Sequence, residues 1–124
     1  MQSNSATALR NKYLIETSEL QELIDKKDAN LKLVNATWYM PNEGKDPWEE
    51  HLKMRITNDT VFFDHDLICD KTIPLPHTMP SLSIFKWRMK KLGIMKDSRI
   101  VCYDVPGCFS VARASWMLRY FGAA

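Results

Sequence analysis

Two acidic residues and two histidines are the side chains of this sequence best suited to proton transfer. Asp64, His65 and Asp66 follow one another, and His77 comes after them, beyond a proline-rich stretch. A carboxylate beside an imidazole can orient and charge the ring for general acid or base catalysis. The residues alone leave two interpretations open, which are catalysis and hydrogen bonding within a loop.

Cys108 is a second candidate for chemistry, because it lies in a turn before a predicted helix. A helix N-terminus can lower the pKa of a thiol and so produce a nucleophilic thiolate. The alternative is a small residue that fills the turn. The spacing from Cys108 to Arg113 is one residue shorter than the loop of a cysteine-dependent phosphatase requires, which disfavours phosphatase chemistry. Cys102 alternates along an apolar strand and is interpreted as a core residue.

The remaining composition excludes several classes of protein. Cys69, Cys102 and Cys108 form no C-x-x-C pair, and no histidine stands at a metal-site spacing beside them, so the sequence predicts no metal site. The odd cysteine count and seven methionines favour a reducing compartment. The net charge of +2 and the lack of an apolar run near the ~20 residues that span a bilayer predict neither a nucleic-acid nor a membrane partner.

The length of 124 residues, with 45% hydrophobic and 26% charged residues, suits one modest domain. We expect a flexible segment over residues 1–12 and a single domain over 13–124. The first twelve residues contain no acid but include Arg10 and Lys12, which resembles a mitochondrial presequence; a flexible start is the alternative. The expected compartment is therefore the cytoplasm or the mitochondrion.

Hydrophobic periodicity predicts alternating strands and helices, which is typical of an α/β fold with a mostly parallel sheet. Strands are expected at residues 14–15, 31–38, 60–63 and 99–103. Helices are expected after a cap at Thr17 or Ser18, and at residues 48–54, 81–92 and 110–121, with Gly93 ending the third. Three of the six prolines fall within residues 70–80, which predicts an ordered surface loop.

The last two helices are expected to turn their apolar positions toward the core. These positions are Ile84, Phe85, Trp87, Met89, Leu92, Val111, Ala114, Trp116, Met117, Tyr120 and Phe121. Arg113 and Arg119 lie on nearly opposite faces of the final helix, so we expect one to face a carboxylate inside and the other to face solvent. The start of that helix, just beyond a parallel strand, is where α/β proteins bind anions and place nucleophiles.

Four blocks of sequence resemble one known family. They are residues 33–41 (LVNATWYMP), 62–66 (FFDHD), 74–80 (PLPHTMP) and 101–122 (VCYDVPGCFSVARASWMLRYFG). Their order and spacing are similar to the N-terminal, non-catalytic domain of two-domain sulfurtransferases, the rhodanese and 3-mercaptopyruvate sulfurtransferase family. The resemblance implies a three-layer rhodanese-like fold whose last strand and helix are missing here.

The family pattern also assigns roles to residues. Its catalytic cysteine belongs to the C-terminal domain, and the equivalent position here is Asp104, which cannot accept sulfane sulfur. An Asp and a His of the N-terminal domain, matching Asp66 and His77, are proposed in the family to complete a triad with a serine of the catalytic loop. Asp64 and Arg113 match positions interpreted as structural. The chain departs from the pattern at Asn35, at Thr57 and Asn58, and at Ala123.

The resemblance implies the N-terminal half of a sulfurtransferase that moves sulfur from 3-mercaptopyruvate or thiosulfate to a thiol or cyanide acceptor. It would need a C-terminal catalytic domain as partner, small sulfur donors and thiol acceptors, and no cofactor or metal. A non-enzymatic interaction module on the same scaffold is the main alternative. A third is a redox-active or persulfide-accepting thiol at Cys108.

Overall fold

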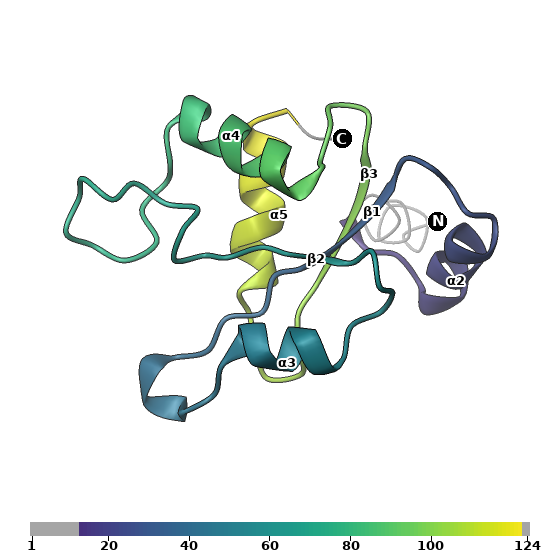
Figure 1. Ribbon diagram of the computed structural model, residues 1–124, viewed down its shortest axis with the longest axis horizontal. Coiled ribbons are helices and arrows are strands. Elements are labelled where there is room, and N and C mark those ends of the chain that lie inside the picture. Colours follow the sequence, from purple (N-terminus) through teal and green to yellow (C-terminus); the bar gives the residue numbers. More distant parts are fainter. Residues whose placement is uncertain (1–12, 123–124) are drawn as a thin grey trace, which may run out of the picture. The chain divides into compact units, whose positions relative to one another are not determined.

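A computed structural model describes residues 13–122, which fall into two compact units. The described part of the first unit ends at Leu31 and contains helix α2 (Thr17–Asp25). The second unit starts at Lys32 and contains the sheet and the remaining helices (Figure 1). The expected flexible segment over residues 1–12 lies outside the described residues.

Two details predicted for the first unit are wrong. Leu14 and Ile15 form no strand but lie in an irregular segment, 65% and 36% exposed respectively. Two apolar residues make a strand only where a neighbouring strand pairs with them, and local sequence does not supply that neighbour. Helix α2 begins one residue earlier than a Thr17 cap requires and two earlier than a Ser18 cap requires, because its N-cap is Glu16, which makes no side-chain capping bond.

The sheet of the second unit has three strands among the described residues. They are β1 (Leu31–Asn35), β2 (Val61–Phe62) and β3 (Arg99–Tyr103), in the order β2-β1-β3. The strands are parallel, with Val34 opposite Val61 in the β1–β2 pair. Strand β1 ends before the predicted residue 38 because the Asn35 side-chain oxygen accepts the Thr37 N–H, which turns the chain away from the ladder.

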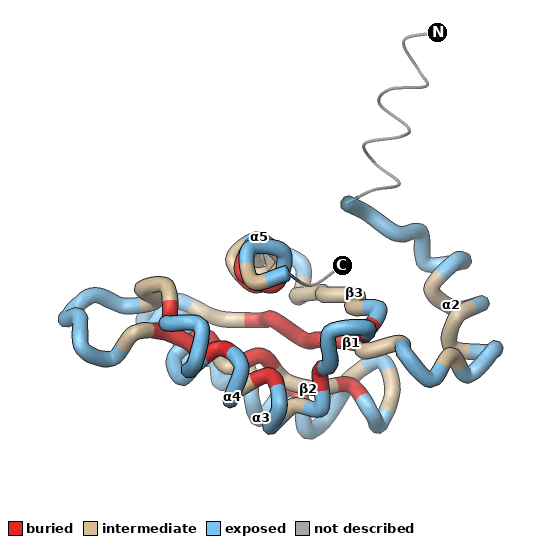
Figure 2. Tube along the Cα trace, turned by 90° about the horizontal axis from the view of Figure 1, so that it is seen from above, coloured by how far each residue is buried: buried red, intermediate tan, exposed pale blue. Residues whose placement is uncertain are grey.

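Helices lie on both faces of this sheet, so the second unit has three layers. Figure 2 shows α5 (Val111–Tyr120) on one face and both α3 (Pro47–Lys53) and α4 (Leu82–Leu92) on the other. A short 3-10 helix, η1 (Pro41–Glu43), follows β1. The predicted limits of α4 are confirmed, because the Ser81 hydroxyl accepts the Ile84 N–H and Gly93 ends the helix with a φ of 75°.

The core lies between the sheet and the helices. Its buried members are Val34, Ala36, Phe63, Ile68, Phe85, Met89, Ile94, Ala114, Met117 and Leu118. Three aromatic residues expected there are on the surface instead, since Trp87, Trp116 and Tyr120 are 51%, 59% and 65% exposed. On α5 the stripe of residues 114, 117, 118 and 121 faces the sheet, and Trp116 stacks on Tyr120 away from it, with 5.2 Å between ring centroids.

The proline-rich segment over residues 70–80 is an irregular loop, as predicted. The Asp70 N–H donates to the Thr78 carbonyl at 3.0 Å. The Asp70 carboxylate accepts from the backbone N–H and from the hydroxyl of Thr72. These bonds close the loop on itself and fix the place of His77. No helix over residues 13–122 has the length and apolar character required to cross a membrane.

Candidate active site

The candidate site lies where β1 and β2 end. Trp38 follows β1, residues 64–69 follow β2, and the proline loop brings His77 to the same place. Parallel strands present their carboxyl ends at one edge of a sheet, and α/β proteins bind ligands there. Residues distant in the sequence therefore meet at this edge.

His77 and Asp66, the pair that the family resemblance singled out, lie within hydrogen-bond distance. His77 Nε2 donates to Asp66 Oδ1 at 2.9 Å, because an ionised carboxylate only accepts hydrogen bonds. This bond fixes the proton on Nε2 and leaves Nδ1 as the nitrogen that can accept one. The Trp38 ring meets the His77 ring edge-on, with 4.5 Å between centroids. The pair reaches the surface, since the side chains of His77 and Asp66 are 19% and 65% exposed.

His77 also has an uncommon backbone conformation. Its φ of 57° lies in the left-handed region, which few residues other than glycine adopt. The Arg113 Nε–H donates to the His77 carbonyl at 3.3 Å and so holds the loop from the side of α5. A strained residue that its surroundings hold in place is typical of functional sites.

Arg113 faces inward, as one of the two arginines of α5 was expected to, but its partners are not carboxylates. Besides the His77 carbonyl, it donates to the Ile68 carbonyl and to His65 Nδ1, both at 2.9 Å. His65 completes the chain of bonds by donating from Nε2 to the Ala36 carbonyl at 2.9 Å. Arg113 therefore joins α5, the β2 loop and the proline loop, while Arg119 is exposed.

Replacing Arg113 with methionine is expected to lower the free energy of unfolding by about 3 kcal/mol, because buried acceptors lose their donor at roughly 1–3 kcal/mol each. Urea unfolding measures this loss. The exposed cation Lys90 of α4 gives the matched control, and Lys90→Met should change stability by no more than about 0.5 kcal/mol. Equal effects of the two substitutions would show that Arg113 does not join these segments.

His65 is buried as the neutral ring. It is 2% exposed, and burial lowers its pKa to about 4. Its Nδ1 accepts from Arg113, so a second proton would break that bond. The folded state therefore disfavours the charged ring, and the stabilisation is complete above the unfolded pKa of about 6.5. It is lost as the pH falls from about 6.5 toward 4.

Wild-type chain is therefore expected to lose about 2 kcal/mol more stability than His65→Gln between about pH 7.5 and pH 5. Glutamine keeps a donor for the Ala36 carbonyl and does not titrate in this range. Burial also lowers the pKa of His51, but this group contributes equally to both proteins. Urea unfolding at several pH values measures the difference. Parallel stability curves for the two proteins would contradict the neutral, buried state of His65.

Asp64, Asp104 and Cys108 have structural contacts. Asp64 Oδ1 accepts the N–H groups of Asp66 and Leu67 and so shapes the β2 loop. Asp104 Oδ2 accepts the Val111 N–H at the start of α5. Cys108 donates from Sγ to the Trp38 carbonyl. Burial, and then the nearby carboxylates of Asp104 and Glu43, raise the pKa of its thiol, which favours the residue that fills a turn over the activated thiolate.

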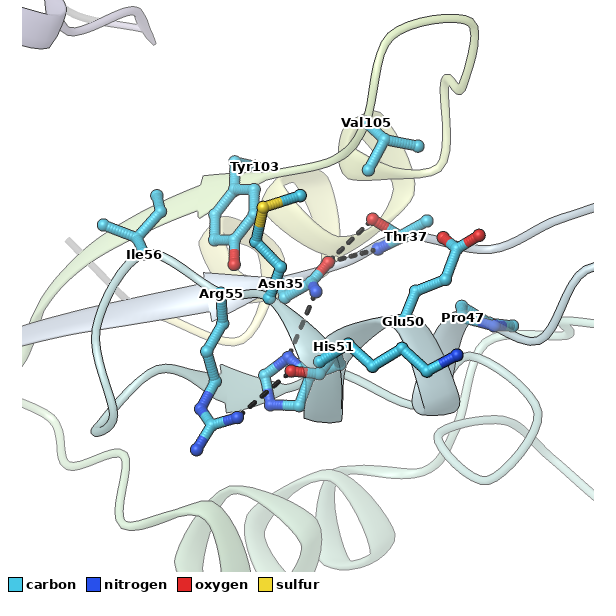
Figure 3. Close-up of a pocket in the computed structure, with 11 residues that line it drawn as sticks. Asn35, Thr37, Pro47, Glu50, His51, Arg55, Ile56, Tyr103 and Val105 are labelled. Atoms are coloured by element: carbon cyan, nitrogen blue, oxygen red, sulfur yellow. Dashed lines mark hydrogen bonds between the residues drawn. The ribbon is translucent and has the colours of Figure 1, made fainter.

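A second concave region lies on the α3 side of the sheet, a hollow of about 620 Å³ between α3 and the ends of β1 and β3. Figure 3 shows that Asn35 links its walls, since Nδ2 donates to His51 Nδ1 at 3.1 Å and Oδ1 accepts from Thr37. An aspartate at this position, as the family pattern has, could not donate to a neutral His51. Asn35 departs from the family pattern, but its side chain still anchors the loop that follows β1.

Sequence reasoning missed two contributors to these sites. Trp38 was taken as the end of a strand, although its place after a central parallel strand puts it beside the site. His51 was not singled out, and no local signal marks it. Across residues 13–122, no three acidic, histidine or cysteine side chains gather closely enough to hold a metal ion.

Known proteins resemble this chain over most of its length. The mitochondrial thiosulfate/3-mercaptopyruvate sulfurtransferase 1 of Arabidopsis thaliana is 39% identical over 113 residues, which cover 87% of this chain and 30% of that protein. The 3-mercaptopyruvate sulfurtransferase of Escherichia coli K12 is 38% identical over 111 residues, covering 89% of this chain and 38% of that protein.

A solved structure agrees with these relatives. The crystal structure of an Escherichia coli 3-mercaptopyruvate sulfurtransferase, described as having the rhodanese fold, matches with a TM-score of 0.82 and 34% identity. The match covers 90% of this chain and 42% of that one. The expected rhodanese-like α/β fold is thus confirmed. The chain spans 30% to 38% of the length of these two relatives, and no protein-family model matches it.

Proposed function

Since this chain belongs to the thiosulfate/3-mercaptopyruvate sulfurtransferase family, we propose that it is the half of such an enzyme that lacks the sulfur-carrying cysteine. In the complete protein, a second domain would supply that cysteine, and this domain would supply His77 and Asp66 to the cleft between them. The donor would be 3-mercaptopyruvate or thiosulfate, and the acceptor a thiol or cyanide.

The observation that supports this division of roles is the absence of a suitable thiol at the end of β3. Asp104 occupies that place, and its carboxylate would repel an anionic sulfur donor. Burial raises the pKa of Cys102 to about 12, and it raises the pKa of Cys108 as well. Cys69 is buried, and its thiol donates to the Asp66 carbonyl. Each of the three cysteines is thus a poor nucleophile.

The pair of His77 and Asp66 suits proton transfer to or from a group that another domain presents. Asp66 holds the His77 proton on Nε2, so Nδ1 can accept a proton from a hydroxyl or thiol placed above it. The Asp66 side chain is 65% exposed, and covering its carboxylate would remove water and strengthen the bond to the imidazole. The pair therefore has the geometry of an active site that a second surface completes.

A domain exchange tests the proposal. The segment of the Escherichia coli enzyme that aligns with this chain is replaced by this chain, and turnover of 3-mercaptopyruvate with dithiothreitol is measured. We expect the hybrid to turn over well above the Escherichia coli remainder alone. A hybrid that folds, by circular dichroism, yet is no faster than the remainder would contradict the proposal and favour the interaction module.

A further inference from the structure

A third concave region is lined by residues of α3, β2, the loop after β2 and α4. This region, the α4 hollow, has a volume of about 340 Å³. Trp48 of α3, Phe62 of β2, and Leu67 and Leu92 give it apolar walls, and Arg88 and Lys91 of α4 border it. Figure 2 shows α3 and α4 on the same face of the sheet, and in the view of Figure 1 β2 passes between them. The volume lies at the lower end of the roughly 300–1,000 Å³ of ligand pockets, which suits a small group such as one large side chain.

The two cations at the border lack an anionic partner within the described chain. The Arg88 guanidinium carbon is 4.5 Å, and Lys91 Nζ 5.3 Å, from the centre of the Trp87 ring. Neither side chain forms an ion pair over residues 13–122. Arg88 Nε is also buried without a hydrogen-bond acceptor. A carboxylate that enters the hollow would pair with the Arg88 guanidinium group that borders it.

The α4 wall of the hollow is positively charged. Residues 81–96 contain five cations and no carboxylate, counting Lys86, Arg88, Lys90, Lys91 and Lys96. The one carboxylate in the lining belongs to Asp64, and its Oδ1 accepts backbone N–H groups of the β2 loop. The charge at the hollow therefore favours an anionic ligand.

We propose that the α4 hollow is a docking site for an acidic peptide segment of a partner protein, with one apolar side chain inserted between Trp48 and Leu92 and carboxylates on Arg88 and Lys91. Trp48 and Trp87 are 49% and 51% exposed beside the hollow. Large aromatic residues and arginine are the side chains that contribute most at protein interfaces. The proposal does not depend on the proposed sulfur-transfer chemistry.

Fluorescence anisotropy with a fluorescein-labelled peptide tests the site. The probe is Glu-Asp-Glu-Phe-Asp-Glu, and the matched peptide has alanine in place of phenylalanine. We expect the probe to bind the 124-residue chain, and Arg88→Gln and Lys91→Gln each to weaken binding about tenfold. Lys96→Gln removes an exposed cation of the same segment outside the hollow, and it should change binding less than about threefold.

Three other outcomes would contradict the proposed docking site. No binding of the probe, equal loss in all three variants, or equal affinity for the alanine peptide would each show that no side-chain hollow recognises an acidic segment. Vesicles of phosphatidylserine form the last arm. Binding to vesicles that Arg88→Gln abolishes, without binding to the peptide, would assign the surface to a membrane instead.

Discussion

Replacing His77 with alanine in the hybrid enzyme is expected to lower turnover of 3-mercaptopyruvate by about 10²- to 10⁴-fold, the range typical of a lost general acid or base. The reason is geometric. His77 has one nitrogen fixed by Asp66 and the other available, and Arg113 and Trp38 hold the residue in place. Alanine keeps the backbone bond from Arg113 but removes the proton carrier.

Asp66→Asn in the same hybrid should have a smaller effect. Asparagine can still accept the Nε2–H but does not stabilise the charged imidazolium, so the expected loss lies below that of His77→Ala. The matched control is Asp64→Asn, whose carboxylate accepts backbone N–H groups of the loop and does not bond to His77. If both His77→Ala and Asp66→Asn kept full activity across about pH 6 to 9, the two residues would have a structural role and no role in catalysis.

Much of the fold follows from local sequence signals. The limits of β3 and α4 agree with the sequence because each signal is complete by itself: a β-branched run for β3, and Ser81 and Gly93 at the ends of α4. The strand expected at Leu14 and the buried place expected for Trp116 are wrong for a different reason. Both depended on which neighbour packs against the segment, and hydrophobicity alone does not specify a neighbour.

The sequence likewise predicts some contacts of the candidate site and not others. The residue types put Asp64, His65, Asp66 and His77 in one group, and the family resemblance singled out Asp66 and His77, which the structure joins by a hydrogen bond. The contacts of Arg113 were predicted incorrectly, since two of its three acceptors are backbone carbonyls, of Ile68 and His77. Every residue has a backbone carbonyl, so the residue types do not indicate which carbonyls accept from Arg113.

The second large effect is expected for the isolated chain. Sulfur transfer needs a nucleophilic thiolate, which a lowered thiol pKa favours and which takes sulfur as a persulfide. Burial raises the pKa of Cys102 and Cys108 instead, and Cys69 is buried. We therefore expect the 124-residue chain to show turnover at background level, orders of magnitude below the hybrid enzyme.

The most direct measurement is thus the sulfurtransferase assay of the isolated chain, with thiosulfate and cyanide and with 3-mercaptopyruvate and dithiothreitol. Wild type and Cys108→Ser are compared at equal concentration, because Cys108 is the cysteine that lies between β3 and α5. If the sulfur-carrying thiol belongs to another domain, both proteins give the rate of the buffer alone. Robust turnover of the wild type that Cys108→Ser abolishes would make this chain the catalyst by itself, and would contradict its place as the partner half of an active site.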